Sequence, residues 1–385
     1  MKPHSAIWVL SLAVILAMAA LVSQPSHTLL EPVALTSLHG WSEDDHVAAL
    51  AAFRLSCLEI VDAGRSLLRP ARFGPPREAW LPLCRDAVTA VDARSFFEDK
   101  FSAWRVNDSE RPEGLFTGYY EPEAEGSRTQ SPRFSIPVYG LPSDLVMFDA
   151  ASEAKLGLKY GRLVRGEPQS YFTRREIEQG ALAGRGLEIA WVANRADLFF
   201  MQVQGSGRLR LPDGGAMRLA YAGKTGLPYT AIGGVLVARR AFPREGNSMQ
   251  AIRTWMMRHA NEAQALMWEN SSYVFFREVT VDDAALGAPG AQKVNLTPLR
   301  SLAVDRALWQ FGTPVWLDAQ VPSGSGETSQ AFRHLLIAQD TGSAIKGLAR
   351  GDVFWGAGET AAAIAGLMKS RGAMTVLLPK GFDPR

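Results

Sequence analysis

The pattern of apolar and polar positions predicts a helical beginning followed by a mostly β body. Between about residues 42 and 105, apolar side chains recur at helical spacing, and Ser42 before an acidic first turn is expected to cap the first helix. A second helix is predicted over Trp80–Val91 and a third around Phe96–Phe101. These helices carry no evident chemistry and form a lead-in to the rest of the chain.

From Gly114 onward the pattern changes to short β-like runs separated by Gly and Pro, which is typical of a small barrel or sandwich. A short helix is predicted where Thr173 and Glu176 can form a capping box. A longer helix is expected over Ser248–Trp268, and a last one over Thr360–Lys369, ended by Gly372.

One stretch combines apolar runs with two carboxylates. Leu335–Ala338 is typical of a buried strand, and the turn residues Gln339–Gly342 place Asp340 at its end. Asp352 lies directly before a second short apolar run, Val353–Trp355. Two aspartates at strand ends could converge on one site. The alternative is that Asp340 only caps a turn while Asp352 faces solvent.

Composition is that of a globular protein with a sizeable core, because 47% of residues are hydrophobic and 21% are charged. The formal net charge of +2 carries little information about partners, and no basic run with interleaved aromatic residues suggests nucleic acid. About 360 residues remain after the N-terminal segment, enough for two domains of ordinary size.

Residues 1–22 resemble a secretory signal peptide. Lys2 and His4 precede the apolar run Ile7–Val22, which is shorter than the ~20 residues that span a bilayer, and cleavage is plausible near Ala19 or Ala20. An uncleaved N-terminal anchor is the alternative. No Cys ends the run, so a lipoprotein is not expected, and the bulk of the chain is predicted to be exported.

Cys57 and Cys84 are the two cysteines of the chain. In an oxidising compartment such a pair most simply forms one disulfide, closing a loop on the order of 27 residues and contributing roughly 3 kcal/mol. A nucleophilic Cys is not supported, because no His lies in a recognisable partner motif. Two cysteines are also too few for a usual structural zinc site.

Five further stretches are distinctive: Phe116–Pro122, Asp197–Gly207, Tyr221–Tyr229, Ser272–Arg277 and the end that runs from Asp305 to Gly358. The QVQGSG and two-aspartate segments are the most specific. Together these stretches resemble the membrane-bound lytic murein transglycosylase A family, including its three-aspartate (3D) domain. Their order along the chain also matches the family's order.

The resemblance implies a mainly β fold with N-terminal helices: a double-psi β-barrel domain, a second, smaller β-barrel domain inserted into it, and a groove between them. On this sequence, residues 23–122 plus 271–385 would form the catalytic domain with its helical lead-in, with the 3D domain at about 285–360. Residues 123–270 would form the family-specific insert.

The resemblance also implies the chemistry. The family cleaves the β-1,4 bond between N-acetylmuramic acid and N-acetylglucosamine and leaves a 1,6-anhydro end, with one Asp serving first as acid and then as base. Asp352 matches that catalytic residue, and its apolar neighbours would raise its pKa and keep it protonated. Asp340 matches the second aspartate, expected to orient substrate or stabilise charge, and Asp305 matches the third, with a structural role favoured.

Sugar binding needs planar amides, aromatic faces and close backbone approach. Independently of the resemblance, Gln202 and Gln204 offer amides, although an alternating strand with polar residues facing water would explain both. The candidate substrate-binding residues are Thr117, Tyr119, Gln202, Gln204, Gly205 and Ser206, and Tyr120, Gly207 and Trp355 offer similar chemistry. The chain departs from the family's usual pattern at Ser343, where Gly is usual, and at Thr225, where Asn is usual.

The resulting hypothesis is a monomeric enzyme in the periplasm of a Gram-negative bacterium, with membrane association left open, that acts on peptidoglycan glycan strands without a metal or other cofactor. Cell-wall synthesis or division proteins are candidate partners. Two alternatives remain. An exported glycoside hydrolase would use Asp340 and Asp352 as a pair and give a reducing end instead of an anhydro end. A non-catalytic peptidoglycan-binding protein would give no product.

Overall fold

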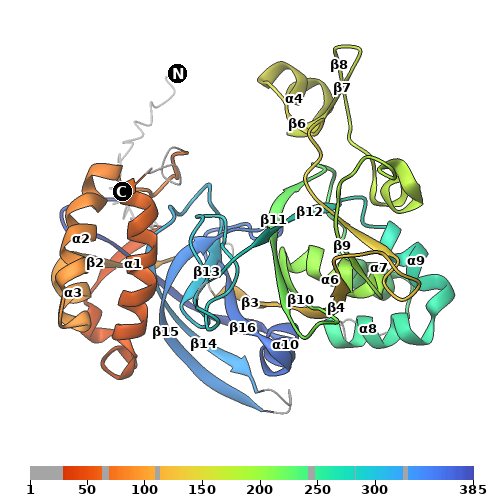
Figure 1. Ribbon diagram of the computed structural model, residues 1–385. Helices are drawn as coiled ribbons and strands as arrows, with labels where there is room; N and C mark the ends of the chain where they lie inside the picture. The colour runs from red at the N-terminus through yellow and green to blue at the C-terminus, as the bar shows by residue number, and fades with distance from the viewer. Residues whose placement is uncertain (1–28, 63–68, 109–112, 242–247, 282, 324–327) are drawn as a thin grey trace, which may run out of the picture.

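A computed structural model of the chain describes residues 29–62, 69–108, 113–241, 248–281, 283–323 and 328–385. This part of the chain contains two large β-sheets, each flanked by helices (Figure 1). The prediction of a mainly β protein with N-terminal helices is confirmed. The predicted signal peptide at residues 1–22 lies outside the described residues.

Among the described residues the first sheet has eight strands, in the order β1-β2-β17-β14-β15-β13-β16-β3. Strand β17 also pairs with β3, so the strands from β17 to β3 close into a ring. Within the ring, β13 is parallel to β15 and β16 is parallel to β3, whereas the other pairs are antiparallel. The strands are β1 (Leu30–Val33), β2 (Phe101–Val106), β3 (Gly114–Glu121), β13 (Ser301–Val304), β14 (Pro314–Pro322), β15 (Ser329–Asp340), β16 (Arg350–Ala357) and β17 (Lys369–Pro379).

The N-terminal helices pack against this sheet through an aromatic core that includes Phe53, Trp80 and Trp316. The disulfide between Cys57 and Cys84 joins α1 to α2, with the two Cα atoms 5.2 Å apart, as the sequence predicts. The helices are α1 (His46–Asp62), α2 (Arg77–Thr89) and α3 (Ala93–Lys100), preceded by the 3₁₀ turns η1 (Leu35–Ser37) and η2 (Trp41–Glu43).

The expectation that Ser42 caps the first helix is wrong. Residues Trp41–Glu43 form a 3₁₀ turn because the Trp41 side chain is buried in the core, and α1 begins only at His46. The side chain of Asp45 instead accepts a hydrogen bond from the backbone N–H of Ala48 at 3.0 Å, which is the geometry of an N-cap.

A buried ion pair fastens the helical lead-in to the sheet. The guanidinium of Arg300 donates two hydrogen bonds to the carboxylate of Asp44, at 2.8 and 2.9 Å, and His334 and the backbone N–H of Leu335 contact the same carboxylate. Burial raises the pKa of Asp44, but the bonds from His334 and Arg300 outweigh this and hold it well below its usual range. Arg300 directly precedes β13, so this pair fixes where that strand starts.

The second sheet has the order β12-β11-β10-β4-β9-β5 and buries an apolar face against helix α6. Helices α7 to α9 pack on the other side of α6. The elements are β4 (Glu123–Ser127), β5 (Ile136–Tyr139), β9 (Glu188–Val192), β10 (Ser206–Arg210), β11 (Ala216–Lys224), β12 (Val274–Val279), α6 (Arg195–Gln204), α7 (Ile232–Ala238), α8 (Met249–Arg258) and α9 (Ala260–Trp268).

A small three-stranded sheet projects from this second unit (Figure 1). The predicted capping box is confirmed: Thr173 and Glu176 bond reciprocally at the start of α5. The remaining elements are β6 (Val146–Met147), α4 (Ala150–Leu156), β7 (Tyr160–Val164), β8 (Glu167–Gln169), α5 (Arg174–Glu176), the π-turn η4 (Ile177–Ala181) and α10 (Gly358–Leu367).

Three predicted elements are corrected. Gln202 and Gln204 lie on helix α6 rather than on an alternating strand, because apolar residues on both of its sides are buried, one set against the sheet and one against α7–α9. The helix expected over Ser248–Trp268 is two helices, broken at His259, although Ser248 caps the first as predicted. Gly372 does not end the last helix. It lies within β17, where a Cβ would meet the carbonyl oxygen of Asp318 at 2.5 Å.

Removing the disulfide should destabilise the folded chain without changing its fold. The bond closes a loop across a sequence separation of 27 residues. Its loss in the double variant Cys57→Ser/Cys84→Ser should therefore lower the free energy of unfolding by about 3 kcal/mol. Urea unfolding of the variant and of the oxidised wild type measures the difference. Equal midpoints would contradict the prediction.

Candidate active site

Asp340 and Asp352 lie on either side of one residue of a short strand. Ala303 on β13 is the register partner of Asp340 on β15 and also of Asp352 on β16. Thr117 on β3 is in turn the register partner of Asp352. Directly opposed residues of neighbouring strands share a face, so the four side chains form a row across the barrel wall. Two strand spacings separate the aspartate Cα atoms by about 10 Å.

One oxygen of the Asp352 carboxyl group accepts a hydrogen bond, and the other accepts none from the described residues. The hydroxyl of Thr117 donates to Oδ1 at 2.6 Å, and the guanidinium of Arg350 donates to that hydroxyl at 2.8 Å. Because a guanidinium can only donate, the single hydroxyl proton of Thr117 is directed toward Asp352. Within the described residues, no group donates a hydrogen bond to Oδ2. A proton carried by Asp352 would therefore reside on Oδ2.

The pKa of Asp352 is raised above its usual range. Burial is the largest cause and the negative charge of Asp340 adds to it, while the positive charge of Arg350 and the hydrogen bond from Thr117 oppose the rise. The apolar floor beneath the row contributes to this burial, since Tyr119, Leu296, Ala303, Ile345 and Phe354 pack together there. The site thus favours a protonated Asp352 more than water would.

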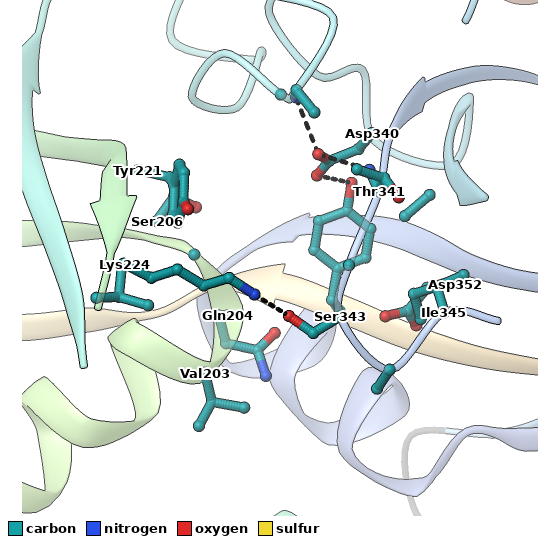
Figure 2. Close-up of a pocket in the computed structure, with 18 of the residues that line it drawn as sticks. Val203, Gln204, Ser206, Tyr221, Lys224, Asp340, Thr341, Ser343, Ile345 and Asp352 are labelled. Carbon is teal, nitrogen blue, oxygen red and sulfur yellow. Dashed lines mark hydrogen bonds between the residues drawn. The ribbon is translucent and has the colours of Figure 1, made fainter. Parts of the chain in front are cut away.

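Asp340 differs from Asp352 because both of its carboxyl oxygens accept hydrogen bonds. Oδ1 accepts from the backbone N–H groups of Ala291 and Thr341, each at 2.9 Å, and Oδ2 accepts from the Tyr119 hydroxyl at 3.0 Å (Figure 2). Burial raises the pKa of Asp340, and these bonds oppose the rise. Burial also raises the pKa of Tyr119 well above its usual value, so Tyr119 remains a phenol that donates. Asp340 is held in place by three donors.

The two aspartates line a cleft of about 610 Å³ whose opposite wall belongs to the second sheet. Figure 2 shows Gln204, Ser206, Tyr221 and Lys224 on that wall, with the Lys224 side chain extending to Ser343 near the aspartates. The Nζ atom of Lys224 donates to the Ser343 hydroxyl at 2.7 Å, so this bond crosses from one wall to the other.

The segment Gln202–Ser206 lies at the cleft, but its residues differ in what they can offer. Both polar atoms of the Gln202 amide form hydrogen bonds within the protein. Its oxygen accepts from buried Arg174 at 2.5 Å, and its nitrogen donates to the Val274 carbonyl at 2.9 Å. Gln204 accepts from the backbone N–H of Tyr120 at 3.0 Å and also lines the cleft. Gly205 ends α6 with φ +85°, a conformation that favours glycine, and Ser206 begins β10.

Asp305 is not among the residues that line this cleft. Its carboxylate accepts from the backbone N–H groups of Ala307 and Gly347, each at 3.1 Å, and from Lys346 at 3.4 Å. It therefore links the turn after β13 to the loop that leads into β16.

Other residues that the sequence offered for substrate contact lie away from the cleft. Tyr120 points to the opposite side of β3, toward Ala361 and Ala365, and Trp355 packs against Phe332. A Cβ on Gly207 would meet the Met201 sulfur at 2.3 Å, so that position is small because of packing rather than sugar approach. Thr225 is fully buried and accepts from the backbone N–H of Tyr273, which excludes a direct contact with a ligand in the cleft.

The sequence interpretation missed Arg350, Ala303, Tyr221 and Lys224, all of which line the cleft. Arg350 lies two residues before Asp352, so the two side chains share a face of a strand. This spacing could have identified Arg350 as a site residue. The other three are brought in by pairing between distant segments, which local pattern does not reveal.

Within the described ranges, no group of three or more His, Cys, Asp and Glu side chains is arranged to hold a metal ion. Likewise, none of the helices in the part of the chain that the structure covers is long and apolar enough to cross a membrane.

Comparison with known families and proteins gives consistent matches. The MltA specific insert domain matches residues 115–277, and the 3D domain matches residues 300–378. Membrane-bound lytic murein transglycosylase A of Vibrio cholerae is 36% identical over 237 residues, which cover 60% of this chain and 56% of that protein. Its Escherichia coli K12 counterpart is 31% identical over 290 residues, covering 74% of this chain and 72% of that protein. The chain thus spans just over half the length of the first relative.

Solved structures of other proteins are also similar to this chain. A membrane-bound lytic murein transglycosylase from Agrobacterium tumefaciens superposes with a TM-score of 0.82 at 34% identity, covering 92% of this chain and 98% of that chain. Escherichia coli MltA with bound chitohexaose gives a TM-score of 0.65 at 26% identity, covering 93% of both chains.

The role of Thr117 can be tested without any substrate. The variant Thr117→Val loses the hydrogen bond that stabilises the charged form of Asp352, so the pKa of Asp352 should rise and the proton should persist to higher pH. Carboxyl ¹³C NMR titration measures this, with the resonance assigned by its loss in Asp352→Asn. Thr89→Val, on the exposed end of α2, is the matched control. An unchanged or lower pKa in Thr117→Val would contradict the role.

Proposed function

Because the chain belongs to the membrane-bound lytic murein transglycosylase A family, we propose that it is a peptidoglycan lytic transglycosylase that uses Asp352 as its single acid and base. The substrate bond would be the β-1,4 linkage between N-acetylmuramic acid and N-acetylglucosamine. The product would carry a 1,6-anhydro-N-acetylmuramic acid end.

The observation that carries this proposal is the difference between the two buried carboxyl groups. Asp352 has a raised pKa and one oxygen without a donor among the described residues, whereas both oxygens of Asp340 accept hydrogen bonds. A general acid needs a proton at neutral pH and an oxygen that can reach the leaving group. The raised pKa of Asp352 favours its protonated form, and Oδ2 is the oxygen that can reach the leaving group, whereas both oxygens of Asp340 already accept hydrogen bonds, which suits a carboxylate that stays charged.

The proposed reaction has two proton transfers at one atom. Oδ2 of Asp352 first donates its proton to the glycosidic oxygen as the bond to the muramic anomeric carbon breaks, which generates oxocarbenium character on that carbon. The resulting carboxylate then accepts the proton of the muramic C6 hydroxyl as that oxygen bonds to the anomeric carbon. The proton returns to Asp352 and no water is consumed.

The other residues would position the substrate and the acid. Thr117 and Arg350 orient Asp352, and Asp340, held by Tyr119 and two backbone N–H groups, would face the positive charge that develops on the reacting sugar. Gln204, Gly205 and Ser206 are the proposed sugar contacts, and Gln202 would act indirectly through Arg174. The chitohexaose-bound Escherichia coli relative supports a sugar chain in the cleft. Asp305 is proposed to be structural.

We also propose the domain division implied by the family: residues 23–122 and 271–385 as the catalytic unit, and 123–270 as the insert. The strands of the closed ring come from both sides of the insert in the sequence, and two of the strand pairs are parallel. Both features support a double-psi barrel. Strand β12, at Val274–Val279, pairs with β11 of the second sheet, which suggests that the insert extends slightly past residue 270.

Export to the bacterial envelope is likewise proposed, from the signal-like residues 1–22 and from relatives named as membrane-bound. Peptidoglycan glycan strands are the proposed substrate, and the chain is proposed to act as a monomer.

Product analysis tests the function. Mass spectrometry of fragments released from purified peptidoglycan should find anhydro-muropeptides with wild type, and at least about a hundredfold fewer with Asp352→Asn. Asp340→Asn should be slower than wild type but give the same anhydro product. Reducing ends together with complete loss of activity in both variants would instead indicate a two-carboxylate hydrolase. No product from folded wild type would overturn the proposed activity.

A further inference from the structure

The cleft is strongly biased to positive charge although the whole chain is nearly neutral, with a formal net charge of +2. Among the described residues, the acidic side chains that line it are Asp340 and Asp352. The basic side chains that line it are Arg69, Lys159, Arg174, Lys224, Arg277, Lys293, Arg306, Lys346 and Arg350. A cleft with this bias attracts anionic groups.

Three of these lysines line the cleft from different segments of the chain. Lys224 ends β11, Lys159 precedes β7, and Lys346 lies in the loop between β15 and β16. Burial lowers the pKa of Lys224, and the positive charges of Lys346 and Lys159 lower it further, so each of these two ammonium groups lies close enough to that of Lys224 to act on its charge. We call Lys159, Lys224 and Lys346 the lysine rim.

The positive charge of the rim is poorly compensated by the protein. The ammonium group of Lys224 donates to the uncharged Ser343 hydroxyl, at 2.7 Å. Lys346 contacts Asp305 at 3.4 Å, but its side chain is 65% exposed. Among the described residues, neither Lys159 nor Lys224 has a carboxylate within 4.0 Å. Clustered like charges without counter-charges destabilise the ligand-free protein, and an anion bound between them would relieve that cost.

The rim does not serve to neutralise the catalytic aspartates. The positively charged neighbour of Asp352 is Arg350, and that of Asp340 is Lys293. The pKa values of both aspartates still remain above their usual range. Lys224 instead points its ammonium group across the cleft toward Ser343, where a ligand lying along the cleft must pass it (Figure 2).

We propose that the lysine rim is a carboxylate-binding subsite, which recognises acidic substituents carried by the sugar strand in the cleft. The sugar backbone itself is uncharged, so the anion must come from a free carboxylate of a peptide stem or from the lactyl group of muramic acid. This inference rests on the proposed function and adds a specificity to it: acidic glycan is selected over neutral glycan. The Lys224–Ser343 bond holds the central ammonium in place for this contact.

Binding measurements separate this subsite from catalysis. Full-length protein carrying Asp352→Asn, so that no ligand is consumed, is titrated with a disaccharide–tetrapeptide and with the same compound whose carboxylates are converted to methylamides. The acidic compound should bind about fivefold tighter, and this ratio should fall as NaCl is raised. Adding Lys224→Met should bring the ratio close to one. Lys155→Met, on an exposed lysine of α4 outside the cleft, should leave it unchanged.

Two further ligands identify the source of the anion. Glycan stripped of peptide, which carries a free lactyl carboxylate, is compared with neutral chitohexaose, both with and without Lys224→Met. A Lys224-dependent preference for the stripped glycan assigns the rim to the lactyl carboxylate, and its absence assigns the rim to the peptide stem. Equal affinity within both pairs, the acidic against the amidated disaccharide–tetrapeptide and the stripped glycan against chitohexaose, would overturn the subsite, as would a Lys224→Met effect of the same size on both members of each pair.

These outcomes do not depend on the reaction. If wild type releases no anhydro product but the acidic ligand is still preferred through Lys224, the proposed activity fails and the subsite stands. If anhydro product forms and the preference is absent, the subsite alone fails.

Discussion

The site depends on one short strand held between two others. Ala303 on β13 pairs with Asp340 on one side and with Asp352 on the other, so backbone hydrogen bonds of the barrel set the spacing of the two carboxyl groups. The Asp44–Arg300 ion pair holds the start of β13, and the backbone carbonyl of Arg300 accepts from the N–H of Ile337 on β15 at 2.7 Å. A small side chain at Ala303 leaves space between the aspartates. Disturbing any of these contacts would move both carboxyl groups together.

The surroundings then give two similar carboxyl groups different environments, on which their different proposed roles rest. Burial raises the pKa of both, but Asp340 accepts three hydrogen bonds while Asp352 accepts one, from a hydroxyl that Arg350 orients. Asp340 is therefore suited to remain a fixed charge-stabilising group, and Asp352 to carry and exchange a proton at Oδ2. The second sheet supplies the facing wall and one member of the lysine rim, Lys224. The proposed subsite would add selectivity without altering the proton chemistry.

Local sequence pattern predicted the strands that carry both aspartates, the Thr173 capping box and the disulfide, because each depends on neighbouring residues or on residue type. Thr117 was named only through the family resemblance. Its hydroxyl is hydrogen-bonded to Asp352, which lies 235 positions later in the sequence. Strand pairing could not be predicted, so Ala303, Tyr221 and Lys224 were missed. Helix α6 was misread because both its faces are buried, which removes the amphipathic pattern that identifies a helix.

The proposed bond cleavage uses an internal hydroxyl and no water. Digestion of peptidoglycan in H₂¹⁸O, followed by mass spectrometry of the released muramic acid ends, tests it directly. Anhydro ends without ¹⁸O are expected, because the C6 oxygen closes onto the anomeric carbon of the same sugar. Incorporation of one ¹⁸O at each new end would contradict it and establish hydrolysis.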